Sequence, residues 1–410
     1  MKRAQAVLAA SLLAPAVALA FETVDTLPWP SSGRFPAYGS EATGAPTDLW
    51  LQAGVMYDDN ILRLESGALD DTVMRFGGGF RTAQRVYGRQ TLIVDARADY
   101  YMFDRFDDLD HLGYSAAGDW RWEIGNKLSG SIVLGRERRL ADLGETQSAV
   151  RSIVTGTRLT ASAGSLVTPS LRLRGGVGAS RSERDTRDDA ETRAASAIAA
   201  IEYVSGLGNT VGVEVRAADG DAPVDEEITG VALVNNDFEE REVALVAAYS
   251  LGPRLRADGR LGRTTREYSE LPSRNFEGTT WRFGGEWLPG NKTSLALAFF
   301  KEPRSIIDVA ASHVLVKGVT FGPSWAPTAK LVLSARLLRE EREFEGDPRF
   351  AVGLEPLRDE TIDALRFGIG WEPQRHWQVV VALDTGKRSS NFAGRDYDFT
   401  ALSGNVAWRF

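Results

Sequence analysis

The chain has 410 residues, of which 43% are hydrophobic and 25% charged, and its formal net charge is -8. This length allows one large architecture or two to three ordinary domains. The acidic balance argues against general affinity for nucleic acid, and the absence of cysteine excludes disulfides and thiolate metal sites. Only seven of the 48 basic residues are lysine. The abundant arginine suits bidentate pairing with carboxylates in a wet interior.

The N-terminus has the pattern of a secretory signal. Lys2 and Arg3 form a basic start, residues 6–17 form a short apolar core, and Ala20 ends a small-x-small sequence. We therefore predict a cleaved signal peptide over residues 1–20. Its removal would make the net charge two units more negative.

Residues 21–47 are rich in Pro, Gly and Ser and predict a loose periplasmic leader. No later stretch holds the ~18 consecutive apolar residues of a transmembrane helix. From Asp48 onward the sequence instead alternates between polar and apolar residues. A strand separates such residues onto two faces, whereas a helix would scatter the charges around its surface.

The segment 91–103 illustrates the alternation. Leu92 and Tyr100 fall on one face, while Asp95 and Asp99 fall on the other. The same period recurs in residues 118–124, 209–219, 253–262, 279–289 and 376–384. We predict strands at all of these places.

The connections between predicted strands alternate between short and long. Eight tight turns hold Gly, Pro or Asn, and they lie at residues 87–90, 125–127, 168–170, 206–209, 252–254, 289–292, 327–330 and 373–376. Nine longer polar loops lie near residues 59–71, 104–111, 140–149, 183–190, 218–237, 266–275, 302–312, 344–360 and 388–396. Seventeen connections give 18 strands, with 16 to 20 as the range. We therefore predict an all-β, antiparallel up-and-down transmembrane barrel over residues 48–410, with short periplasmic turns and long extracellular loops.

The tryptophans support this prediction, because all but Trp29 lie near a tight turn or a terminus. They are Trp50, Trp120, Trp122, Trp281, Trp287, Trp325, Trp371, Trp377 and Trp408. A barrel places such rings in a girdle at the membrane–water boundary. The final sequence NVAWRF accordingly predicts Val406, Trp408 and Phe410 facing lipid in the last strand.

Charged residues on the opposite strand faces are predicted to line the lumen. An Arg or Lys facing lipid at mid-bilayer costs about 2–4 kcal/mol in a barrel. The candidate pore-lining residues are Asp95, Arg97, Asp99, Arg121, Arg172, Arg174, Glu214, Arg216, Arg254, Arg256, Asp258, Arg260, Arg282, Arg336 and Arg366. They form a solvated wall stiffened by ion pairs between strands, a selective path for a hydrophilic chain, or both. A barrel of this size leaves an aqueous channel unless a segment plugs it.

Signals for catalysis or cofactor binding are weak. His111, His313 and His376 show no distinctive Ser/His/acid spacing. The sequence YDDN at Tyr57 to Asn60 offers carboxylates, but it does not supply the 6–8 oxygen ligands of calcium, and a polar strand-to-loop transition explains it better. We predict no catalytic residue, no metal site and no cofactor.

Several stretches resemble a known family. They are residues 55–64, 95–114, 314–337 and 386–410. They are similar to the EpsL-type outer-membrane protein of exopolysaccharide gene clusters, which is associated with exosortase/PEP-CTERM systems in Gram-negative bacteria. The resemblance implies a barrel that helps to assemble or export extracellular polysaccharide. The partners it implies are outer-membrane lipid and lipopolysaccharide, the exopolysaccharide, the barrel-insertion machinery and periplasmic export components.

Three functions are therefore in competition. The first is an outer-membrane conduit that passes exopolysaccharide through a charged lumen. The alternative is a general or solute-selective porin. The third is a closed barrel with a structural or surface-modifying role. The sequence specifies neither the polymer nor the direction of transport, and it leaves open whether the leader plugs the lumen.

Overall fold

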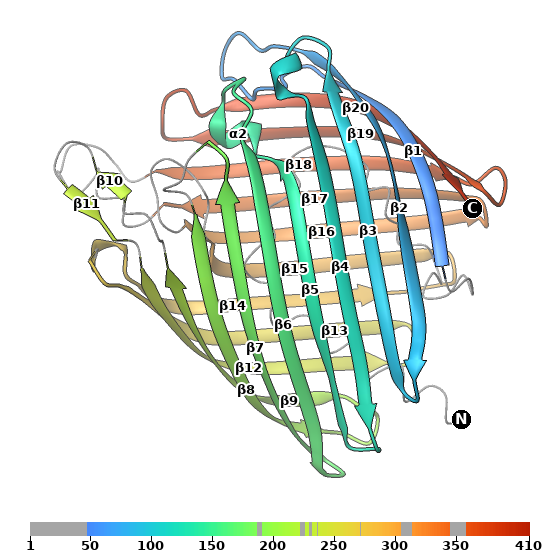
Figure 1. The fold of residues 1–410 in the computed structure, drawn as a ribbon, viewed down its shortest axis with the longest axis vertical. Coiled ribbons are helices and arrows are strands. Elements are labelled where there is room, and N and C mark those ends of the chain that lie inside the picture. Colours follow the sequence, from blue (N-terminus) through green and yellow to red (C-terminus); the bar gives the residue numbers. More distant parts are fainter. Residues whose placement is uncertain are drawn as a thin grey trace.

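The computed structural model describes residues 47–186, 191–221, 226–228, 232–235, 237–270, 272–304, 314–344 and 358–410. They form a closed antiparallel barrel of 18 strands (Figure 1). The barrel strands are β1 (Thr47–Asp58), β2 (Asp71–Tyr87), β3 (Gln90–Phe103), β4 (His111–Ile124), β5 (Leu128–Leu140), β6 (Ile153–Thr168), β7 (Leu171–Arg184), β8 (Thr192–Val204), β9 (Thr210–Asp221), β12 (Phe238–Leu251), β13 (Leu255–Tyr268), β14 (Phe276–Trp287), β15 (Thr293–Arg304), β16 (Val314–Thr328), β17 (Leu331–Glu343), β18 (Asp359–Trp371), β19 (Trp377–Ser390) and β20 (Tyr397–Arg409). The predicted signal peptide and all of the predicted leader except Thr47 lie outside the described residues.

Short elements occur in the connections. They are the small hairpin β10 (Glu226–Ile228) and β11 (Ala232–Val234), the helix α2 (Leu143–Thr146), and the 3-10 turns η2 (Asp107–Leu109) and η4 (Pro272–Arg274). The sequence predicted loops at these places and missed the elements within them. In the part of the chain that the structure describes, no helix is both long and apolar enough to span a membrane.

The first and last strands close the barrel. β1 pairs with β2 on one side and with β20 on the other, from Trp50 opposite Arg409 to Asp58 opposite Ala401. The backbone N–H of Phe410 then donates to the carbonyl oxygen of Leu49 at 2.9 Å. Closure pairs the backbone groups that an open sheet edge would leave exposed to lipid. The C-terminal sequence is therefore part of the closing seam.

The alternation of short and long connections is confirmed. All eight predicted tight turns and all nine predicted long loops separate consecutive barrel strands. For example, two residues join β2 to β3, whereas residues 59–70 join β1 to β2. We call the two ends of the barrel the short-turn end and the long-loop end.

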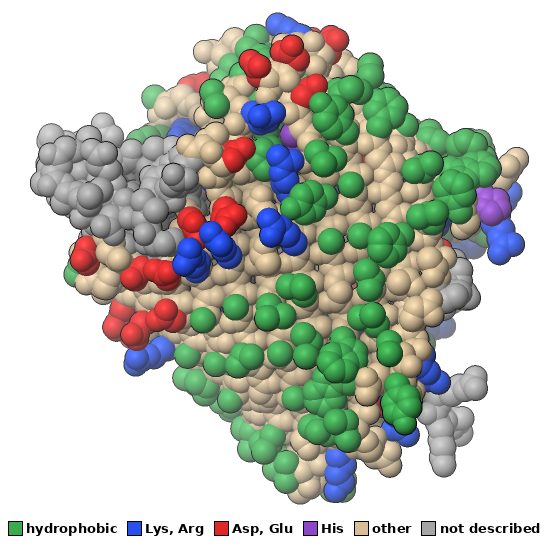
Figure 2. Space-filling model, in the orientation of Figure 1, with side chains coloured by type: hydrophobic (Ala, Val, Ile, Leu, Met, Phe, Trp, Pro, Cys, Tyr) green, Lys and Arg blue, Asp and Glu red, His purple; other side chains and the backbone are tan. Residues whose placement is uncertain are grey.

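Side chains alternate between the outside and the inside of the barrel. In β9, Val211, Val213 and Val215 are exposed on the outside, whereas the inward Glu214 is 0% exposed. Apolar side chains spread over the outer surface in Figure 2. Such a large exposed apolar surface is unfavourable in water and matches the hydrocarbon core of a membrane.

Tryptophans form a girdle on the outer surface near the short-turn end. The exposed members are Trp120, Trp287, Trp325, Trp371, Trp377 and Trp408. Trp50 departs from this pattern, because it occupies an inward position of β1 and its ring lies against Gly79 of β2. The sequence predicts a girdle position for Trp50 because this residue lies near a terminus. The alternation of side chains along β1 instead places Trp50 on the inner face of the barrel.

Charged side chains on the outer face gather toward the long-loop end. Arg263 and Glu277 pair at 2.7 Å, and Lys317 and Glu341 pair at 3.0 Å. On the face of the barrel that Figure 2 shows, most charged side chains likewise lie in the upper and left part of the view. Because a charge is costly against hydrocarbon, these pairs mark the height at which the apolar band ends.

Candidate functional site: the barrel lumen

Arginine and glutamate side chains of neighbouring strands pair along the inner wall of β7 to β13. Glu214 of β9 accepts hydrogen bonds from Arg174 Nη2 and Arg260 Nη1, both at 2.5 Å. Glu202 of β8 pairs with Arg172 and Arg174 of β7, and Glu242 of β12 pairs with Arg260 at 2.5 Å. We call this network the ladder, and its members are Arg172, Arg174, Glu202, Glu214, Arg260 and Glu242. A buried carboxylate is tolerated when guanidinium groups satisfy its oxygens in this way.

Paired charges continue around the barrel. Glu240 of β12 lies between Arg216 at 3.0 Å and Arg266 at 2.6 Å. Further along, Arg304 of β15 joins Glu302 at 3.0 Å to Glu340 of β17 at 3.1 Å. Ion pairs between strands thus cross-link the inner wall from β7 to β13 and again from β14 to β17, as one of the two sequence interpretations proposed.

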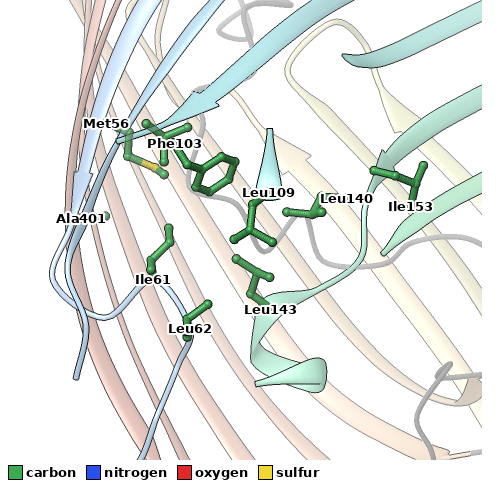
Figure 3. Packing of buried hydrophobic residues seen from close by; sticks show 10 residues of the cluster. Met56, Ile61, Leu62, Phe103, Leu109, Leu140, Leu143, Ile153 and Ala401 are labelled. Carbon is green, nitrogen blue, oxygen red and sulfur yellow. The ribbon is translucent and has the colours of Figure 1, made fainter. Parts of the chain in front are cut away.

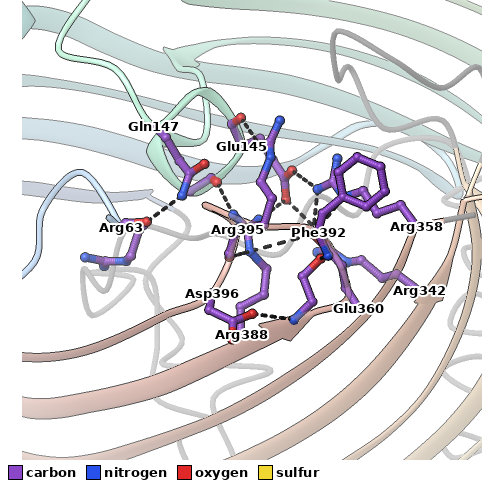
Figure 4. Close-up of polar contacts among 12 residues, drawn as sticks. Arg63, Glu145, Gln147, Arg342, Arg358, Glu360, Arg388, Phe392, Arg395 and Asp396 are labelled. Atoms are coloured by element: carbon purple, nitrogen blue, oxygen red, sulfur yellow. Dashed lines mark hydrogen bonds and ion pairs between the residues drawn. The ribbon is translucent and has the colours of Figure 1, made fainter. Parts of the chain in front are cut away.

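One long loop crosses the barrel. Residues 141–152, which we call the crossing loop, connect β5 to β6 and contain α2. Glu145 of this loop binds Arg342 of β17 at 2.7 Å and Arg388 of β19 at 3.3 Å (Figure 4). β6 and β17 are nine strands apart in the ring of 18, so they stand on opposite sides of the lumen. The crossing loop therefore bars part of the lumen at the long-loop end.

Several further contacts hold the crossing loop in place. Arg358, which precedes β18, lies 3.5 Å from Glu145. Arg388 Nη2 donates to the carbonyl oxygen of Gly144 at 2.8 Å, and Arg395 Nη1 donates to the carbonyl oxygen of Glu145 at 2.9 Å. We call Glu145, Arg342, Arg358 and Arg388 the Glu145 cluster.

The charges of the cluster set the ionisation of Glu145. Burial alone would raise the pKa of its carboxyl group, but the positive charges of Arg342, Arg388 and Arg358 outweigh burial, and the pKa lies below its usual value. Glu145 is therefore ionised at neutral pH, and its charge holds the crossing loop to the far wall.

An apolar cluster anchors the near side of the crossing loop. Leu143 of α2 packs with Leu109 and Ile61 from two other long loops, and with Met56 and Phe103 from the inner wall (Figure 3). Three loops thus share one small hydrophobic core above β1 to β6. Burial of these side chains favours the folded loops over loops free in solvent.

The lumen below these loops is hydrated. Arg256, Asp258 and Arg336 occupy inward positions nearer the short-turn end, and all three are exposed. An inward side chain can be exposed only if solvent reaches the interior. Among the described residues, protein fills part of the long-loop end of the barrel, and solvent reaches the inner wall below it.

The inner wall of β4 to β6 differs from the ladder in carrying small side chains. Its inward residues include Ser115, Ala117, Ser131, Gly135, Gly156, Thr160 and Ser162. We call it the small-residue wall. It lies beneath the crossing loop, because β5 and β6 are the strands that this loop connects.

Comparison with solved structures identifies the architecture. OccK2 (OpdF) of Pseudomonas aeruginosa matches with a TM-score of 0.50 and 12% sequence identity, over 89% of this chain and 97% of that chain. The chain has the fold of an outer-membrane porin. OccAB3 of Acinetobacter baumannii gives a TM-score of 0.45 at 11% identity, over 89% of this chain and 99% of that chain. No family model matches the chain, and no curated protein matches it.

The structure places fourteen of the fifteen predicted pore-lining residues at inward positions of strands. Arg254 is the exception, because it lies in the turn between β12 and β13. Four of the predicted residues meet in the ladder, namely Arg172, Arg174, Glu214 and Arg260. Others pair locally: Arg97 with Asp99, Arg121 with Asp119, Arg216 with Glu240, Arg282 with Glu302, and Arg366 with Asp384.

Sequence reasoning missed several residues of the lumen. Glu202 and Glu242 occupy inward positions in regular strands, so a stricter reading of the alternation could have found them. Glu145 lies in a polar loop and carries no such signal. Its partners Arg342 and Arg388 are 197 and 243 residues away in the sequence. Only the closed barrel brings them together.

The weaker motifs have structural roles. Asp58 of the YDDN sequence pairs with Arg63 at 2.7 Å, and it also accepts the backbone N–H of Asn60 at 2.9 Å. His111 stacks on Tyr101, while His376 contacts the carbonyl oxygen of Arg409 at the short-turn end. His313 lies outside the described residues. Within the described ranges, no three His, Asp or Glu side chains form a group that could hold a metal ion.

Proposed function

We propose that the chain is a porin-type channel of the outer membrane through which small hydrophilic solutes diffuse. The observation that carries this proposal is the crossing loop, which the Glu145 cluster holds across a lumen that stays hydrated below it. A loop fixed inside a wide barrel narrows the passage, so it admits small solutes and restricts large ones. The porin fold supports the same function.

The apolar outer face and the tryptophan girdle support a place in the outer membrane, with the short-turn end in the periplasm. In this position the charged pairs near the long-loop end would meet the headgroups of lipopolysaccharide. Insertion by the barrel-insertion machinery would use the C-terminal strand β20 and Phe410, which follows it.

Export of exopolysaccharide rests on the sequence resemblance alone. A long polymer needs a continuous bore, whereas the crossing loop spans the lumen between opposite walls. The small-solute channel therefore has the stronger support, and polymer export with its periplasmic partners is the alternative outcome of the test.

The test uses purified, folded protein in planar bilayers and in liposomes. We expect discrete single-channel currents, and liposome swelling in monosaccharides that falls steeply as the sugar chain is lengthened. The variant Glu277→Gln, on the outer face, should behave like the natural chain and serves as the control. Entry of long polysaccharide with sustained block of the current would favour the export conduit. Absence of both current and swelling would favour the closed barrel.

A further inference from the structure

Two arginines on the outer face of the barrel differ from the other outward-facing arginines of the described strands. The others each pair with a carboxylate, and they are Arg181, Arg193, Arg241, Arg263 and Arg339. Arg136 and Arg138, both on β5, have no carboxylate partner among the residues that the structure describes. The unpaired arginines of the outer face are therefore concentrated on one strand, near its long-loop end.

The contacts of these two arginines leave most of their donors unused. Arg136 Nε donates to the hydroxyl oxygen of Tyr114 at 3.1 Å, and Arg138 Nη1 donates to the carbonyl oxygen of Leu112. A guanidinium group has five N–H donors, and the hydroxyl group of Tyr114 keeps its own hydrogen for a further acceptor. Arg136 and Arg138 are two residues apart on the same face, so their Cα atoms are about 7 Å apart.

A third arginine reaches the same place from the crossing loop. Arg151 is exposed, and its Nη1 donates to the carbonyl oxygen of Asp110 at 3.3 Å. The carbonyl groups of Asp110 and Leu112, which bind Arg151 and Arg138, are about 7 Å apart along an extended chain. The positive charges therefore gather at one place. We call this group the arginine patch, and its members are Arg136, Arg138, Arg151 and Tyr114.

Neighbouring carboxylates do not neutralise the arginine patch. Toward the long-loop end, the described carboxylates of β4 to β7 and of the loops next to these strands are Asp104, Asp107, Asp108, Asp110, Glu137, Asp142, Glu145, Glu183, Asp185 and Glu191. None of them forms an ion pair with an arginine of the patch in the described ranges. Glu183 and Glu191 bind Arg181, and Glu137 faces the lumen, where it binds Arg139.

Apolar surface begins next to the patch, toward the short-turn end. Leu134 follows Arg136 on the outer face of β5 and stands opposite Leu159 of β6, and these leucines are 55% and 46% exposed. Gly118 of β4 stands opposite Leu134 on the other side, and a Cβ added there would meet no atom within 4 Å. The outer face thus has a shallow apolar recess at Gly118 beside unpaired positive charge.

We propose that the arginine patch binds a phosphate group of an acylated glycolipid, namely lipid A in the outer leaflet. Guanidinium groups match phosphate in a bidentate geometry, and clustered basic residues at a membrane surface recognise lipid headgroups. Arg136 and Arg138 would bind phosphate oxygens, while an acyl chain would lie in the recess at Gly118. A soluble anion would use the charges and leave the recess empty, so the lipid is the better match. The proposal rests on the proposed membrane orientation and is independent of conduction.

The test measures binding to the full folded chain in detergent by titration followed with native mass spectrometry. The probes are diphosphorylated lipid A, phosphatidylglycerol, whose phosphate carries one charge, and inorganic phosphate. We expect lipid A to bind about tenfold more tightly than phosphatidylglycerol, and inorganic phosphate at the same concentration should not displace it.

Variants locate the site on the outer face. Arg136→Gln and Arg138→Gln should each weaken lipid A binding about tenfold, as the loss of a charged hydrogen bond implies. Gly118→Phe should also weaken binding by filling the recess, and the open space around Gly118 allows this variant to fold. Arg241→Gln removes an outward arginine that is paired with Glu239, so it is the matched control and should bind normally.

The two proposals fail separately. Equal binding of the two lipids, displacement of lipid A by inorganic phosphate, or full binding by the arginine variants or by Gly118→Phe would overturn the lipid site even if the channel conducts. Arginine-dependent binding of lipid A by a protein that passes no current would support the site and overturn the porin function.

Discussion

The inner wall of β7 to β13 and the inner wall of β4 to β6 share one strand geometry but differ in side-chain chemistry. In the ladder, Glu214 is buried between two arginines. In the small-residue wall, Ala117 and Gly135 occupy equivalent inward positions and leave a hollow. The ladder connects strands by ion pairs and fills space with side chains, whereas Ala117 and Gly135 leave space open beside the small-residue wall.

The crossing loop belongs to the same side of the barrel as the small-residue wall. It starts at β5 and ends at β6, and its Glu145 binds Arg342 and Arg388 across the lumen.

The largest decrease in stability is expected when a carboxylate of the ladder is removed. Glu214→Ala leaves Arg174 and Arg260 without their shared partner, and removing one member of a buried ion network costs about 3–5 kcal/mol. The midpoint of urea unfolding in detergent should fall accordingly. Asp258→Ala, an exposed position in the same wall, is the control and should change little. An unchanged midpoint for Glu214→Ala would show that the ladder does not stabilise the barrel.

Acid should release the crossing loop. The pKa of Glu145 is lowered when the loop is docked, so docking is fully favoured above the ordinary glutamate pKa of about 4.3 and is lost as the pH falls through the lowered value. Conductance should therefore stay constant from neutral pH down to about 5 and rise only at more acidic pH. Glu145→Gln should abolish this acid step. A rise in conductance near neutral pH would show that a group other than Glu145 controls the release of the crossing loop.

A smaller effect is expected for an ion pair on the outer face. Arg263 and Glu277 are both largely exposed, and such pairs contribute about 0.2–1 kcal/mol. Arg263→Gln should lower stability within that range, as measured by the urea midpoint. A loss of stability as large as that of Glu214→Ala would mean that exposed and buried ion pairs stabilise the barrel equally. That result would contradict the expectation that the buried pairs contribute more.

The smallest stability effect is expected on the small-residue wall. Ser162→Arg adds a long side chain at an inward position, where the guanidinium group can extend into water, so stability should change by no more than about 0.5 kcal/mol. Single-channel conductance should nevertheless fall, because the added side chain occupies the open side of the lumen. Normal conductance would place the solute path elsewhere.

The fold could be predicted from the sequence because its signals are local. Alternation within each strand and Gly, Pro or Asn at each tight turn fix the strand count without any knowledge of distant contacts. The alternation of polar and apolar residues within each strand likewise predicts that Glu214 and Arg260 face the inside of the barrel. The prediction of an outward Trp50 was wrong because it used the distance of this residue from a terminus. The alternation of side chains along the strand indicates the inner face.

The lumen could be predicted only in part. Which charges pair depends on neighbouring strands, and the register supplies that information. The partners of Glu145 lie across the barrel, so nothing in residues 141–152 alone indicates that Arg342 and Arg388 bind there. The hollow was also missed, because small residues carry no charge signal in a sequence.

The most direct measurement is the single-channel conductance of Glu145→Gln beside that of the natural chain, at neutral pH and fixed salt. The crossing loop should leave the far wall when the charge at Glu145 is removed, so both proteins should conduct and the variant should conduct more. Equal conductance in the two proteins, or no conductance in either, would contradict a hydrated channel narrowed by the Glu145 cluster.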